Sequence, residues 1–152
     1  MSDRLARMLE TRPWLLADGA TGTNYFAMGL ETGDAPEPWN VDHPERVLAL
    51  HRQFLAAGSD IILTNTFGGS RYRLELHRAE GRVAELNCAA AQLACQAVEE
   101  CGREVVVAGS MGPTGQILEP IGPLSQADAE AAFSEQAAAL VEGGVDVLWI
   151  ET

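Results

Sequence analysis

The hydrophobic positions of this chain gather in four short runs, and each run ends beside a polar residue or a glycine. The runs cover residues 14–17, 61–64, 105–108 and 145–150, and their endings are Asp18, Asn65, Gly112 and Glu151. Intervals of roughly 45 residues suit a repeated strand, loop and helix. If the strands are parallel, their carboxyl ends share one edge of the sheet, which is where α/β proteins place their active sites.

Helical spacing of apolar residues fills most of the intervals. A short helix is expected over residues 3–11, and a second is opened by a capping box of Asp42 and Glu45 and ended by Gly58. A continuous helix is expected over residues 71–101, and the last helix is capped by Ser125. Residues 24–40 are expected to form a long loop, and Trp14 to lie in the core.

This alternation predicts the α/β class, with parallel strands alternating with helices. A (β/α)8 barrel needs about 250 residues, so we expect residues 1–152 to be a single incomplete domain, the first half of a TIM (β/α)8 barrel. Such a half would expose strand edges and an apolar face. It would therefore pair with the missing half-barrel or form a homo-oligomer.

Charge and cysteine content narrow the classes of partner and compartment. A net charge of −12 and an isoelectric point near 4.5 argue against nucleic acid as a partner. No apolar run is long enough to span a membrane, and the amino terminus does not have the pattern of a secretory leader. Three cysteines within one expected helix do not indicate a disulfide framework, so we expect a cytoplasmic protein.

The strand endings carry the candidate chemistry, with a structural alternative at each. The turn after Asp18 could hold an anion on its backbone amides, or could be only a sharp turn. Asn65 could bind an amino acid or be satisfied within the protein. Glu151 is costly to bury without a cation, which could be a ligand ammonium or a Lys or Arg of the protein. Trp39 could hold a methylated cation on its ring, or pin its loop to the body.

Taken together, these motifs resemble the homocysteine S-methyltransferase family. They are Asp18-Gly19-Ala20-Thr21-Gly22-Thr23, Thr64-Asn65-Thr66-Phe67, Gly112-Pro113-Thr114-Gly115 and Glu151-Thr152. The resemblance implies a cytoplasmic methyltransferase of methionine biosynthesis that moves a methyl group from a donor to homocysteine. Zinc, held by three cysteine thiolates, would bind the homocysteine sulfur as thiolate.

The resemblance also implies roles for individual residues. Asp18 and the amides of Gly19 and Ala20 would bind the amino-acid end of homocysteine, and Glu151 would take its ammonium. Two further residues, Asn65 and Thr66, would line the pocket, and Gly112 would shape it. Trp39 resembles the tryptophan of the betaine-using branch, which favours an onium donor such as betaine.

The chain departs from the family in its cysteines. The zinc cysteines of the family come from glycine- and cysteine-rich segments of the second half of the barrel, and Cys88, Cys95 and Cys101 do not match them. We therefore expect the zinc ligands outside this chain, no catalytic or metal-binding residue within it, and no turnover by it alone. The alternatives are the homocysteine-binding half of a cobalamin-dependent methionine synthase, and a non-catalytic half-barrel that self-associates.

Overall fold

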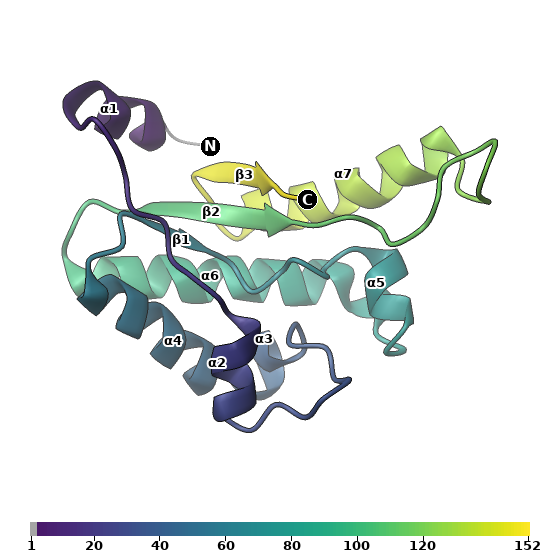
Figure 1. Ribbon diagram of the computed structural model, residues 1–152, viewed down its shortest axis with the longest axis horizontal. Helices are drawn as coiled ribbons and strands as arrows, with labels where there is room; N and C mark the ends of the chain where they lie inside the picture. Colours follow the sequence, from purple (N-terminus) through teal and green to yellow (C-terminus); the bar gives the residue numbers. More distant parts are fainter. Residues whose placement is uncertain (1–2) are drawn as a thin grey trace.

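The computed structural model describes residues 3–152 (Figure 1). Along the chain it contains α1 (Arg4–Thr11), α2 (Gly22–Ala27), α3 (Trp39–Asp42), α4 (Pro44–Ala57), β1 (Ile61–Leu63), α5 (Arg71–Glu75), η1 (Glu80–Arg82), α6 (Val83–Cys101), β2 (Val106–Met111), α7 (Gln126–Glu142) and β3 (Val147–Ile150). The strands form one parallel sheet in the order β1-β2-β3. The predicted alternation of parallel strands with helices is confirmed.

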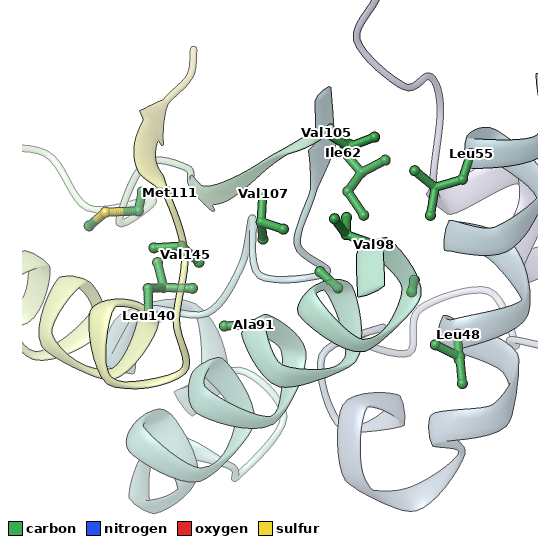
Figure 2. Packing of buried hydrophobic residues seen from close by; sticks show 12 residues of the cluster. Leu48, Leu55, Ile62, Ala91, Val98, Val105, Val107, Met111, Leu140 and Val145 are labelled. Carbon is green, nitrogen blue, oxygen red and sulfur yellow. The ribbon is translucent and has the colours of Figure 1, made fainter. Parts of the chain in front are cut away.

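Alternate strand residues face opposite sides of this sheet, as a parallel strand requires. Ile62 and Val107 pack into a core with apolar side chains of α4, α6 and α7 (Figure 2). The neighbouring residues Ile61 and Val106 face the other side, where Met8 of α1 packs against them. The helix predicted over residues 3–11 is therefore present and covers part of the face that α4, α6 and α7 leave open.

The predicted first strand, over residues 14–17, is wrong in extent. Ala17 alone forms a parallel bridge, to Ile61, and Trp14, predicted to lie in the core, is 69% exposed. Within the described residues this segment has a strand neighbour on one side only, so little apolar surface is available to bury its side chains. The segment still runs alongside β1, because the Asp18 amide donates to the Ile61 carbonyl at 2.9 Å.

The helix ends follow glycine and capping chemistry in most places. Gly58 and Gly102 take left-handed conformations after α4 and α6, with φ of 104° and 66°, as predicted. The Ser125 hydroxyl accepts from the Asp128 amide at 3.1 Å and caps α7. The capping box at Asp42 is wrong, because α3 occupies that residue and His43 precedes α4 without a side-chain cap.

Two further predictions need correction. The helix expected over residues 71–101 is divided into α5, η1 and α6, and Arg78 at the break has a φ of 58°, which an α-helix cannot accommodate. The loop expected over residues 24–40 contains most of α2 and the start of α3. In the part of the chain that the structure describes, none of the helices combines the length and hydrophobicity that crossing a membrane demands.

Candidate active site

A cavity of about 550 Å³ lies beyond the carboxyl ends of the strands. Most of the predicted site residues line it, namely Asp18, Gly19, Ala20, Asn65, Thr66 and Glu151. These residues come from three segments far apart in the sequence, which the parallel sheet brings to one edge. The convergence expected from the four strand endings is therefore present, with Gly112 as the exception.

Asp18 is held at the cavity by the neighbouring strand. Its Oδ2 accepts from the Leu63 amide of β1 at 2.9 Å, so its position depends on the pairing of residues 16–18 with that strand. Burial and the nearby charge of Glu151 raise the pKa of Asp18 from its ordinary 3.8 to about 6, although the hydrogen bond from the Leu63 amide opposes the rise. A cationic ligand would stabilise the ionised form of such a partly buried carboxylate.

Glu151 follows β3 and lies over the end of β2. Its Oε1 accepts a short hydrogen bond from the Ser110 hydroxyl, and its amide donates to the Met111 carbonyl at 3.2 Å. Among the described residues, no Lys or Arg forms an ion pair with it. Within the described residues, the charge of Glu151 is therefore available to a cationic ligand.

The turn after Asp18 presents its backbone to the cavity. Gly19 and Ala20 are exposed residues of the lining. Within the part of the chain that the structure describes, neither of their amides donates to another residue. Helix α2 begins two residues later, at Gly22. Two unpartnered amides beside a helix start can bind an anionic group.

Asn65 serves the protein as well as the cavity. Its amide nitrogen donates to the Pro36 carbonyl at 2.8 Å and to Asn40 Oδ1 at 3.0 Å. In return, Asn40 donates to the carbonyls of Asn65 and Leu86, at 2.9 and 3.2 Å. This buried network ties the loop before α3 to the end of β1. The N–H donors of the Asn65 side chain are therefore used within the protein, which agrees with the structural alternative for this residue.

Thr66 is fully buried, and its hydroxyl is used by the sheet. Its Oγ1 donates to the Ser110 carbonyl at 2.7 Å and lies 2.6 Å from Thr64 Oγ1. The Thr64 hydroxyl in turn accepts from the Ser110 amide at 3.0 Å. These bonds join the ends of β1 and β2, so they fix the floor of the cavity.

Gly112 and Trp39 lie outside this lining. Gly112 donates to the Phe67 carbonyl at 3.1 Å, and a Cβ at this position would lie 2.6 Å from that oxygen and from the Phe67 ring. Trp39 is 8% exposed and packs edge-on against Tyr25 at 5.5 Å. The Arg46 guanidinium lies 4.6 Å from the centre of the Trp39 ring, which matches the alternative of a tryptophan that pins its loop.

Several residues of the cavity were missed by the sequence interpretation, and three of them are ionisable side chains with electrostatic effects on one another. Glu37 is 4% exposed and accepts from the Gly68 amide at 2.7 Å, and Arg73 and His77 of the following segment line the same cavity. Burial raises the pKa of Glu37, while Gly68, His77 and Arg73 oppose the rise. The sequence indicated these three residues only through the position of their segments, 33–38 and 71–77, which follow strand endings.

The described residues do not fit a metal centre. No group of three or more His, Cys, Asp or Glu side chains is arranged to hold an ion there. Cys88, Cys95 and Cys101 lie along α6, which packs behind the sheet. Burial raises the pKa of Cys88 and Cys95, which disfavours the thiolate that a metal requires.

Comparisons with known proteins agree with this geometry. The model of a family described as homocysteine S-methyltransferase matches residues 15–152. A methionine synthase from Mycobacterium tuberculosis is 31% identical over 147 residues, which cover 91% of this chain and 12% of that protein. The metallated form of the homocysteine methyltransferase MmuM from Escherichia coli matches with a TM-score of 0.83 and 24% identity, over 97% of this chain and 57% of MmuM. The oxidized form of MmuM gives a TM-score of 0.80.

Proposed function

This chain belongs to the homocysteine S-methyltransferase family, and we propose that it supplies the amino-acid-binding part of a site that methylates homocysteine to methionine. The chain spans about half the length of MmuM and a smaller part of the methionine synthase. The observation that carries the proposal is the pair of carboxylates, Asp18 and Glu151, in one cavity with unpartnered backbone amides. Such a site complements an ammonium and a carboxylate on the same carbon.

In this proposal the amino-acid end of homocysteine lies between the two strand endings. Its ammonium lies beside Asp18 and Glu151 and balances their negative charge, and its carboxylate accepts hydrogen bonds from the amides of Gly19 and Ala20. Asn65 and Thr66 hold the walls of this position through their bonds to neighbouring segments. Because methyl transfer needs no proton transfer, the main contribution of these residues is to orient the nucleophile toward the donor.

We propose an onium compound of the betaine type as the methyl donor. Three carboxylates line the cavity beside the exposed Asp34, namely Asp18, Glu37 and Glu151, and they favour a cationic reactant. The role of Trp39 in donor binding stays a prediction that its buried position and its contact with Arg46 do not support. The similarity to a methionine synthase favours, as a second candidate, part of a cobalamin-dependent enzyme.

The metal of the reaction is proposed to be zinc, as the family resemblance implies. The described residues do not fit such an ion, so its ligands would come from outside them. We therefore also propose that this chain alone does not turn over, and that it works in the cytoplasm. A methyl-transfer assay of the isolated chain with added zinc tests the first point, and product formation would contradict it.

A further barrel segment is proposed to pair along β3. Within the described residues β3 pairs on one side only, with β2, and Ile150 is 84% exposed. An open strand edge with an exposed apolar residue favours association with the rest of a barrel or with a second copy. Native mass spectrometry distinguishes the two, and a purely monomeric chain that gains no partner segment would contradict the proposal.

The function is tested by calorimetric titration of homocysteine into the chain and two variants. We expect Glu151→Gln to weaken binding by about tenfold or more, because a charged hydrogen bond to the ammonium is lost. Glu104→Gln, which removes an exposed carboxylate of the chain, is the control and should bind as the unaltered chain does. Absence of binding, or equal affinity for Glu151→Gln, would contradict the proposal.

A further inference from the structure

Arg73 is an arginine of the cavity whose charge the protein itself leaves unmatched at short range. It lies in α5, is half-buried and lines the cavity. Among the described residues, its guanidinium forms no hydrogen bond and no ion pair within 4 Å. Arg71, two residues earlier, has its charge paired, because its guanidinium binds Glu135 at 2.8 Å on the outer surface.

The Arg73 side chain lies beside the loop that follows β2. A Cβ on Gly115, in the loop after β2, would lie 3.3 Å from Arg73 Nη1 and 3.4 Å from its Cδ. Leu74, the next residue of α5, is fully buried and anchors the helix. The helix that carries Arg73 is thus held by Leu74, and the Arg73 side chain lines the cavity beside Gly115.

Glu37 places a buried carboxyl group in the same part of the cavity. The Gly68 amide donates to its Oε1 at 2.7 Å, and a Cβ on Gly68 would lie 2.8 Å from that oxygen. Glycine at position 68 therefore makes room for the carboxylate. Burial raises the pKa of Glu37, and the charges of His77 and Arg73 oppose that rise, so the carboxyl group and the guanidinium are close enough to influence each other without pairing.

The two ends of homocysteine are already matched elsewhere in the proposed site. Its ammonium is assigned to Asp18 and Glu151, and its carboxylate to the amides of Gly19 and Ala20. Arg73 and Glu37 come from other segments, α5 and the loop before α3, and neither has a role in that assignment. A guanidinium suits a carboxylate, which it can bind through two parallel N–H groups, and a buried carboxylate suits a cation.

We propose that Arg73 is a specificity residue that binds the carboxylate of the methyl donor, and that Arg73 and Glu37 together select a donor carrying both an onium centre and a carboxylate. This inference rests on the proposed function, since it assigns the second reactant of the same cavity. It also explains why the cavity keeps a cationic side chain among acidic ones.

The test compares two onium probes that differ in one group. Glycine betaine carries the carboxylate and tetramethylammonium does not, and each is titrated by calorimetry with homocysteine at saturation. For Arg73→Met we expect betaine affinity to fall by about tenfold or more, with tetramethylammonium affinity unchanged. Arg73→Lys should recover part of the loss. Arg71→Met, which removes a charge from the same helix outside the cavity, is the matched control and should change neither affinity.

Several outcomes would overturn the inference while leaving the proposed function intact. They are betaine affinity that is the same in Arg73→Met and the unaltered chain, betaine that does not bind the unaltered chain, and a loss shared equally by tetramethylammonium. A fall in homocysteine affinity in Arg73→Met as large as that for betaine would instead assign Arg73 to homocysteine. If homocysteine itself fails to bind, the proposed function fails, and the contrast between the two probes without homocysteine still tests Arg73.

Discussion

Replacing Asp18 with asparagine is expected to stabilise the fold while it weakens the site. The folded chain holds this carboxylate with a pKa of about 6 against an ordinary 3.8. A group whose pKa is raised on folding favours the folded state when protonated, and that contribution is lost as the pH rises through the folded value. At pH 8 the ionised Asp18 therefore costs stability, chiefly because it is buried.

The size of the effect follows from the shift. A rise from 3.8 to about 6 corresponds to about 3 kcal/mol once the group is fully ionised. Solvent reaching the partly exposed carboxylate reduces this, so we expect a gain of roughly 1.5–3 kcal/mol in the free energy of unfolding for Asp18→Asn at pH 8. At pH 5 the gain should be about half as large. Asparagine can still accept from the Leu63 amide, so the local hydrogen bond is kept.

Urea unfolding at pH 5 and pH 8 measures this difference directly. Asp34→Asn is the matched control, because Asp34 lines the same cavity but is exposed, and its free energy of unfolding should change little at either pH. Homocysteine binding by Asp18→Asn should fall at the same time. An Asp18→Asn variant that is destabilised at pH 8, or whose gain does not grow between pH 5 and pH 8, would refute the reasoning.

Three further substitutions each remove one structural feature, and their effect is measured as a change in the free energy of unfolding. Gly112→Ala should cost about 1–3 kcal/mol, because its Cβ would lie 2.6 Å from Phe67. The control Gly81→Ala, whose Cβ would have nothing within 4 Å, should cost much less. Equal costs for the two variants would contradict the close contact at Gly112. Asn40→Ala should cost about 1–3 kcal/mol, because it leaves two buried carbonyls without their donor, and an unchanged value would exclude the network. Ser125→Ala should lower the free energy of unfolding by about 0.5–2 kcal/mol, because the cap of α7 is lost. A larger loss that is the same at every pH would mean that the cap is not its cause.

The sequence predicted the layers of the fold because apolar runs and helix-ending glycines are local signals. Gly58 and Gly102 end helices where expected, and three of the four strands lie where their apolar runs do. The segment at residues 14–17 is apolar like the others, although it contains no Val or Ile, and a strand also needs neighbours. Its extent depends on contacts that its own residues do not encode, which is why Trp14 is exposed.

The site was predictable where it follows the strand endings and unpredictable where it depends on loops. Asp18 and Glu151 meet because parallel strands end at one edge. Glu37 enters the cavity from the loop before α3 and Arg73 from the short helix α5, and no periodicity in the sequence marks such positions. Trp39 shows the converse case, since it was expected in a loop at the site but begins α3 and packs its ring against Arg46 and Tyr25.

The most direct measurement is the map of backbone amide signals that homocysteine shifts in the ¹⁵N-labelled chain. If the strand endings bind its amino-acid end, the largest changes fall on Gly19, Ala20 and the Leu63 amide that contacts Asp18, and about tenfold more homocysteine or more is needed to produce them in Glu151→Gln. Changes confined to the far side of the molecule, around Arg52 and Cys101 between α4 and α6, would contradict the account.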